Sequence, residues 1–291
     1  MSVPILNASG CLDALTAPEV ARSLDAFVTK TVTPFPREGN PPPRIADTGQ
    51  WMLNSIGLQN PGIEAWCAES LPRLRELGIP LWVSVGGFSA GDYTIVCERV
   101  DELAEIDVVE LNLSCPNVEE APETAAELVA AARAVTTKPL YAKLSPATGD
   151  LAESARAVAD AGADGLSLVN TIRGLALDPT TLRPRLASGA GGASGPALRP
   201  LALACVYACA RAVDLPIVGM GGVVCGKDAL DLVAAGASMI GVGTALFSDP
   251  STPDRIRAEL TTEVRSRGYA SVATIRGAAH ESVRPSVVST I

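Results

Sequence analysis

The sequence has very few of the side chains on which several common catalytic sites depend. It contains one histidine, His280, among 291 residues. A zinc site built on histidines therefore has too few ligands, and a Ser-His-Asp triad would depend on one residue close to the C-terminus. We expect His280 to be a surface or docking residue, and we expect no metal site.

Cysteine is present, but in no pattern that indicates a disulfide framework or a metal centre. The seven cysteines are an odd number and include no CxxC pair. With no signal peptide at the N-terminus, we expect free thiols in a reducing cytoplasm. Cys205 and Cys209 lie at helical i,i+4 spacing in an Ala-rich run, where we expect two small buried side chains rather than metal ligands.

The charge and hydropathy of the chain exclude two kinds of partner. The formal net charge is −9 and no run of Lys or Arg occurs, so we expect no nucleic-acid-binding face. No apolar stretch approaches the length of a membrane span. An anionic ligand of so acidic a chain must be held by local backbone N–H groups and a few placed cations.

Short apolar runs alternate with Ala-rich amphipathic stretches along the chain. The expected strands are Ile5–Ala8, Phe27–Thr31, Leu81–Val85, Val108–Leu113, Leu140–Lys143, Gly165–Val169, Ile217–Met220 and Met239–Val242. The expected helices are Ala17–Leu24, Ile63–Leu77, Tyr93–Leu103, Glu123–Val135, Asp150–Ala161, Pro200–Ala212, Lys227–Ala235 and Pro253–Arg267. This alternation predicts parallel strands with right-handed helical crossovers, and eight such units predict an α/β fold, a single (β/α)8 TIM barrel over residues 1–291.

Two segments, near 33–62 and 173–196, are longer than ordinary barrel loops. Barrel enzymes build their sites from loops at the C-terminal ends of the strands, so we expect both insertions to border the active site. The first insertion includes the run Leu53–Gly62, which is rich in amides and which spacing alone identifies only as a turn-rich loop.

Glycine clusters close the seventh and eighth expected strands. They are Gly219–Gly222 and Gly241–Thr244. Barrels often bind phosphate at this place, because glycines let backbone N–H groups approach the anion. Tight turns alone are the other explanation, but two such clusters on these two strands favour a phosphate site.

The run Asn112–Asn117 follows the fourth expected strand and contains Cys115. Pro116 disfavours helix at Cys115, so the thiol can be presented on a turn between two asparagine amides. Such a thiol could serve as nucleophile, or as base once its pKa is lowered. A buried structural cysteine is the alternative.

Two lysines end apolar strands. Lys30 follows Phe27–Thr29, and Lys143 follows Leu140–Ala142. Lysine is seldom buried without a partner, and at the top of a barrel strand it usually serves an anion, a developing negative charge or a Schiff base. A lysine that merely extends to the rim is the alternative.

Taken in order, these segments resemble the dihydroorotate dehydrogenase family from about Pro4 to Phe247. The resemblance is carried by Asn7–Gly10, Val28–Lys30, Arg37–Pro41, Asn54–Gly62, Asn112–Asn117, Ala142–Pro146, Asn170-Thr171, Ser194–Pro196, Gly219–Gly222 and Gly243-Thr244. Cys115 resembles the class 1 enzymes, which use a cysteine base. Leu58–Gly62 is most similar to subclass 1B, whose catalytic subunit passes electrons to NAD through a partner iron–sulfur flavoprotein.

The resemblance implies FMN-dependent oxidation of (S)-dihydroorotate to orotate in de novo pyrimidine biosynthesis. Cys115 would take a proton from the substrate while hydride leaves for the flavin, and Lys143 would stabilise the reduced, anionic ring. The implied substrate-binding residues are Lys30, Asn54, Ile56, Gly57, Leu58, Asn112, Asn117, Asn170 and Thr171. The implied FMN-binding residues are Ala8, Ser9, Gly10, Lys30, Thr31, Ser84, Asn112, Lys143, Val169, Gly195, Gly221, Gly222, Gly243 and Thr244.

The electron acceptor and three alternatives stay open at this point. The chain has no iron–sulfur cysteine pattern and no strand-linked GxGxxG, so NAD-linked activity would need a homodimeric core with a separate FAD/iron–sulfur subunit. The short segment Val118–Pro122, where relatives have a longer lid, leaves another dihydropyrimidine or a cyclic imide as an alternative substrate. A phosphate-binding lyase or isomerase without flavin, and a non-catalytic binding subunit, are the other two.

Overall fold

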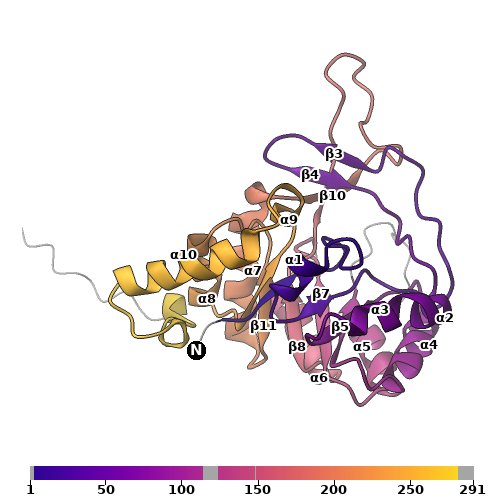
Figure 1. The fold of residues 1–291 in the computed structure, drawn as a ribbon, viewed down its shortest axis with the longest axis horizontal. Coiled ribbons are helices and arrows are strands. Elements are labelled where there is room, and N and C mark those ends of the chain that lie inside the picture. The colour runs from indigo at the N-terminus through magenta and orange to yellow at the C-terminus, as the bar shows by residue number, and fades with distance from the viewer. Residues whose placement is uncertain (1–2, 114–123, 148, 281–291) are drawn as a thin grey trace, which may run out of the picture.

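The computed structural model describes residues 3–113, 124–147 and 149–280, and its main body is a barrel of eight parallel strands (Figure 1). The barrel strands are β1 (Ile5–Asn7), β2 (Phe27–Val28), β5 (Leu81–Val85), β6 (Val108–Asn112), β7 (Leu140–Leu144), β8 (Gly165–Leu168), β11 (Ile217–Met220) and β12 (Met239–Val242). Their order around the barrel is β1-β12-β11-β8-β7-β6-β5-β2. All eight expected strands and the predicted fold are confirmed.

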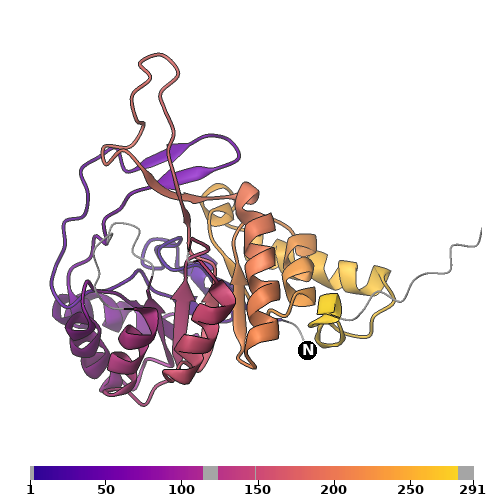
Figure 2. The same cartoon turned by 180° about the vertical axis from the view of Figure 1, so that it is seen from behind.

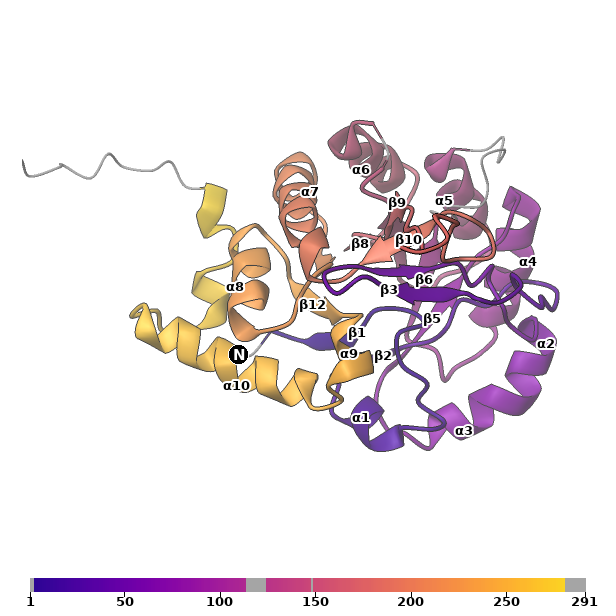
Figure 3. The same cartoon turned by 90° about the horizontal axis from the view of Figure 1, so that it is seen from above.

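Helices cover the outside of the barrel (Figures 2 and 3). They are α1 (Pro18–Arg22), α2 (Ile63–Ala65), the π-helical η1 (Trp66–Ser70), α3 (Leu71–Arg75), α4 (Ala90–Asp101), α5 (Ala125–Arg133), α6 (Leu151–Asp160), α7 (Arg199–Ala212), α8 (Gly226–Ala234), α9 (Ala245–Ser248) and α10 (Thr252–Ser266), with short 3-10 turns η2 (Pro196–Leu198), η3 (Val272–Thr274) and η4 (Ala278–His280). The expected helix Ile63–Leu77 is divided into α2, η1 and α3, α9 was not expected, and α4 starts at Ala90 rather than Tyr93. It starts earlier because the Ser89 hydroxyl caps it, accepting from the Asp92 N–H at 3.3 Å.

The barrel closes between β1 and β2 largely through a side chain. The backbones of these strands share one isolated bridge, Leu6 to Ala26. Beyond it, the fully buried Asn7 amide takes the place of a peptide group. Its Nδ2 donates to the Val28 carbonyl at 2.7 Å, and its Oδ1 accepts from the Val28 N–H at 2.8 Å. Asn7 therefore completes the ladder where the two strands diverge.

Replacing Asn7 by leucine is expected to destabilise the fold by about 3 kcal/mol, since it leaves the N–H and C=O of Val28 without partners and each such buried group costs about 1–3 kcal/mol. Urea denaturation followed by far-UV circular dichroism measures the change in the free energy of unfolding. A loss below about 1 kcal/mol, within what a typical single hydrogen bond contributes, would show that the seam does not depend on Asn7.

Large side chains fill the lower part of the barrel and leave its upper end open. The rings of Trp82 and Tyr141 lie with their centroids 4.6 Å apart, packed among Val28, Val108 and other buried aliphatic residues. Gly165 on β8 makes room for this pair, because a Cβ there would lie 2.3 Å from the Tyr141 ring. The barrel therefore has a solid base, and a ligand can enter only from the C-terminal ends of the strands.

A second, antiparallel sheet lies above that end of the barrel (Figure 1). It contains β3 (Ile45–Asp47), β4 (Met52–Asn54), β10 (Gly191–Ser194) and β9 (Ile172–Gly174), in the order β3-β4-β10-β9. The two long insertions expected as loops thus pair with each other, and Leu53 and Asn54 lie in a strand rather than in a turn. The pairing is close, since a Cβ at Gly191 would lie 2.5 Å from the Asn54 backbone oxygen.

The structure confirms the expectation for His280 as a docking residue and for one of the two α7 cysteines. His280 docks the C-terminal turn, with its Nε2 2.9 Å from the Ala235 carbonyl and its ring stacked on Tyr207. Cys209 is buried as predicted, whereas Cys205 is only half-buried. Across the described ranges, no helix has both the length and the apolar character that a membrane crossing requires.

Candidate functional site

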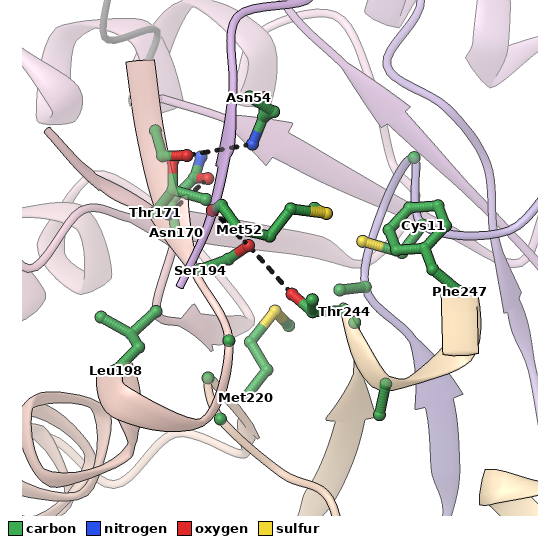
Figure 4. Close-up of a pocket in the computed structure, with 18 of the residues that line it drawn as sticks. Cys11, Met52, Asn54, Asn170, Thr171, Ser194, Leu198, Met220, Thr244 and Phe247 are labelled. Carbon is green, nitrogen blue, oxygen red and sulfur yellow. Dashed lines mark hydrogen bonds between the residues drawn. The ribbon is translucent and has the colours of Figure 1, made fainter. Parts of the chain in front are cut away.

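A cavity of about 750 Å³ lies between the upper end of the barrel and the small sheet. The barrel contributes Lys30, Asn112 and Lys143 to its wall, and the small sheet contributes Met52 and Asn54. Figure 4 shows side chains from both sheets facing the same space. The cavity has the size of pockets that take a drug-sized ligand or a cofactor.

The cavity brings together most of the residues that the sequence singled out. Its wall includes Ala8, Ser9, Gly10, Lys30, Thr31, Asn54, Ile56, Gly57, Leu58, Asn112, Lys143, Val169, Asn170, Thr171, Gly195, Gly221, Gly222, Gly243 and Thr244. Ser84 is not part of the wall; it is fully buried and its hydroxyl lies 3.0 Å from that of Thr31. Cys115 and Asn117 lie outside the described residues.

A network of amides and hydroxyls forms one side of the cavity. Asn170 donates to the Oδ1 of Asn112 at 2.9 Å, and Asn112 donates to the hydroxyl of Thr31 at 3.2 Å. The backbone carbonyl of Asn112 in turn accepts from the Tyr93 hydroxyl at 2.7 Å. Ser84 supports the network from beneath, through Thr31. The orientation of each amide is therefore fixed, which suits recognition of a planar ligand with donors and acceptors on its edge.

The two lysines occupy different environments. Lys30 is exposed and its side chain lies over Gly10, where a Cβ would come within 3.0 Å of the Lys30 Cδ. Lys143 is buried, and its Nζ lies 3.2 Å from the Oε1 of Glu110 on the neighbouring strand β6. Glu110 was not singled out from the sequence. The signal was a single charge in the apolar run Val108–Leu111, two residues before Asn112 and so on the same face of the strand.

A glycine cradle, formed by Gly195, Gly221, Gly222 and Gly243, borders the other end of the cavity. Gly222 has φ +74°, and a Cβ there would lie 2.7 Å from the backbone nitrogen of Arg199 at the start of α7. Only glycine fits this position without displacing the helix. Beside the cradle, the hydroxyl of Thr244 donates to that of Ser194 at 2.9 Å, which joins the end of β12 to the small sheet (Figure 4).

Arg255 on α10 holds the loops of the cradle together, although no motif in the sequence indicates this role. Its guanidinium donates to the Val224 carbonyl at 2.9 Å and pairs with Asp249 at 2.9 Å. Hydrogen bonds from the Ser251 hydroxyl and from Arg255 lower the pKa of Asp249 to about 2. Asp249 therefore stays ionised at neutral pH and keeps Arg255 in place.

Cys11 is a second unexpected residue of the cavity wall (Figure 4), and its Sγ lies 3.5 Å from where a Cβ on Gly243 would be. Burial raises the pKa of its thiol, against the opposing effect of the positive charges of Lys143 and Lys30. At neutral pH the group is therefore a thiol rather than a thiolate, which makes it a poor base.

Comparison with known proteins adds to this geometry. The family model described as dihydroorotate dehydrogenase matches residues 1–264. The chain belongs to the dihydroorotate dehydrogenase family. Family members named "Dihydroorotate dehydrogenase B (NAD(+)), catalytic subunit" include those of Halalkalibacterium halodurans, 41% identical over 95% of this chain and 94% of its own length, and of Latilactobacillus sakei, 46% identical over 88% and 87%.

The dihydroorotate dehydrogenase fold is also seen in a solved structure. The enzyme of Eimeria tenella, crystallised in complex with ferulenol, superposes with a TM-score of 0.79 over 96% of this chain and 85% of its own. Its sequence is 24% identical, so this likeness shows the shared barrel alone.

Proposed function

We propose that this chain is the FMN-dependent catalytic subunit that oxidises (S)-dihydroorotate to orotate in de novo pyrimidine biosynthesis. The observation that carries the proposal is the single cavity in which the glycine cradle, the amide network and Lys143 meet. Relatives at 40–46% identity, matched over nearly their whole length, are named as catalytic subunits of this enzyme. The free cysteines fit a cytoplasmic enzyme.

The residues present fit FMN. The glycine cradle is suited to the phosphate, because residues without a Cβ let backbone N–H groups approach an anion, and the position after the last two barrel strands is a common phosphate site. Ala8, Ser9 and Gly10 would line the flavin, and Lys143 would lie near its pyrimidine edge. FMN, when bound, accepts the hydride that leaves the substrate.

The amide network is suited to the substrate. Dihydroorotate has an imide edge and a carboxylate, and Asn54, Asn112, Asn170 and Thr171 offer both donors and acceptors to such groups. Lys30 supplies a positive charge for the carboxylate. These residues orient the ring, and their fixed hydrogen bonds mean that little reorganisation is needed on binding.

Cys115 would be the base. It follows Asn112, a residue of the cavity wall, by three positions. Its thiolate would take a proton from one ring carbon, and the electron pair left on that carbon would form the new C=C bond of orotate as hydride leaves the adjacent carbon for the flavin. Lys143 would stabilise the negative charge that reduction of the ring creates.

The electrons would pass from the reduced FMN to an FAD/iron–sulfur subunit and then to NAD. This chain has neither an iron–sulfur cysteine pattern nor a dinucleotide fingerprint, so a separate subunit must provide both. We place this subunit on a homodimeric core of the catalytic chain. Co-purification of a yellow-brown partner, and NAD reduction only in its presence, tests this part of the proposal.

Anaerobic titration of the FMN-loaded chain tests the reaction itself. Dihydroorotate is expected to bleach the flavin absorption, whereas dihydrouracil, which has the imide but no carboxylate, is expected to bleach it far more slowly. A chain that binds FMN but stays oxidised with dihydroorotate contradicts the proposal. Bleaching by dihydrouracil alone would assign another dihydropyrimidine as substrate, and a chain that takes up no FMN would favour a barrel lyase or isomerase.

A further inference from the structure

Among the described residues, Glu110 is a buried charge beside the cavity to which the proposed chemistry gives no role. Glu110 is 1% exposed at its side chain, and Lys143 is 6% exposed. The register of β6 and β7 places Glu110 opposite Tyr141 and Lys143 opposite Asn112. Lys143 and Asn112 belong to the cavity wall, whereas Glu110 lies two residues deeper along β6, between Asn112 and Val108 of the buried Trp82–Tyr141 cluster. Glu110 therefore does not line the cavity itself, whereas its partner Lys143 does.

Stability does not explain this ion pair. Taking a carboxylate and an ammonium out of water costs several kcal/mol for each ion, and well-packed apolar residues of similar volume are often as stable or more so. The layer below Glu110 consists of aromatic and aliphatic side chains into which such a residue would fit. We therefore expect this buried ion pair to serve the chemistry of the cavity rather than the stability of the fold.

The pair presents the cavity with a weaker positive charge than a lone lysine. A carboxylate 3.2 Å behind the Lys143 Nζ cancels much of its field at a distance and holds the ammonium in one direction. Both groups lie close enough to act on the cavity wall: burial raises the pKa of the Cys11 thiol, and there Lys143 lowers it and Glu110 raises it further.

We propose that Glu110 is a positioning residue that fixes Lys143 against the flavin and tempers its charge. The inference rests on the proposed function. An electron carrier between a substrate and a second subunit must be reducible by the first and oxidisable by the second. An uncompensated ammonium beside the ring would favour the anionic reduced form and hold the electrons there.

The test is the midpoint potential of bound FMN, measured by slow chemical reduction against a reference dye. E110Q keeps the shape of the side chain and removes its charge. We expect the equilibrium to shift toward reduced FMN at least tenfold, which is a rise of about 30 mV for a two-electron couple. E110D retains the charge on a shorter side chain and is expected to lie between the wild type and E110Q. It also serves as the test variant if E110Q does not fold.

The effect must pass through Lys143, so the same substitution is made in a K143M background. There Glu110 has no lysine to hold or to temper, and E110Q is expected to shift the equilibrium less than threefold. As a matched control, E102Q removes the same charge from the exposed pair with Arg99 and is expected to leave the potential unchanged. An unchanged or lowered potential in E110Q, or an equal shift in the K143M background, overturns the inference.

The experiment separates this inference from the proposed function. The potential is measured without dihydroorotate, so a wild-type potential in E110Q removes the role of Glu110 while the substrate titration still stands. Conversely, FMN-loaded protein that dihydroorotate cannot reduce contradicts the substrate assignment, and the E110Q measurement still reports on the ion pair.

Discussion

Replacing Cys115 by serine is expected to slow the reduction of bound FMN by dihydroorotate by about 10²–10⁴-fold, the usual contribution of a positioned acid–base group. Serine keeps the size of the side chain, but its hydroxyl is a far weaker acid than a thiol and supplies little anionic base at neutral pH. Stopped-flow measurement of flavin bleaching under anaerobic conditions gives the rate. Flavin content and the visible spectrum of the oxidised protein are expected to stay the same.

Two other cysteines make this result specific. Cys67 is half-buried on the outer helix η1, so C67S is a control that is expected to reduce at the wild-type rate. Cys11 lies in the cavity wall itself, and its raised pKa argues against a role as base. If C11S lost more activity than C115S, the base would have to be reassigned to Cys11. A wild-type rate in C115S would remove the base from the proposed mechanism.

Replacing Lys143 by methionine is expected to destabilise the apoprotein by about 3 to 5 kcal/mol, because it leaves the carboxylate of Glu110 buried without its counter-ion. A loss of this size exceeds what most single substitutions cause. Urea denaturation of the FMN-free chain at pH 8 measures it, so that loss of cofactor binding does not enter the comparison.

The double variant E110L/K143M separates loss of a charge partner from loss of packing. It removes both charges and keeps apolar volume in the barrel, and it is expected to recover most of the stability that K143M loses. A double variant no more stable than K143M would show that the Lys143 stem, and not the ion pair, accounts for the effect.

The barrel could be predicted from the sequence because its strands leave a strong local signal. Runs such as Leu81–Val83 and Ile217–Met220 are buried on both faces, so they appear as short, continuous apolar segments between amphipathic helices. The glycine clusters after the last strands and the lysines after apolar runs could also be recognised in the sequence, because neither an ordinary turn nor an apolar strand requires them.

The small sheet could not be predicted, because its strands depend on a distant partner. β10 is Gly-Gly-Ala-Ser, a sequence with poor intrinsic strand propensity. Its glycines are needed for close packing, since a Cβ at Gly191 would lie 2.5 Å from the Asn54 backbone oxygen on β4, and this partner lies far away in the sequence. Cys11 was missed because a single cysteine after Gly10 has no periodicity. Its place in the cavity arises from the end of β12, which folds against it some 230 residues later.

Because the two insertions pair with each other, the small sheet can form only after the second insertion has been synthesised. The Asn54 amide donates to the Gly192 carbonyl across 138 residues of sequence. At a translation rate of about 5–20 residues per second, the first hairpin leaves the ribosome roughly 7 to 28 s before its partner strand exists. During that interval Leu53 has no sheet to cover it, so nascent chains of intermediate length are expected to need chaperone protection at this hairpin.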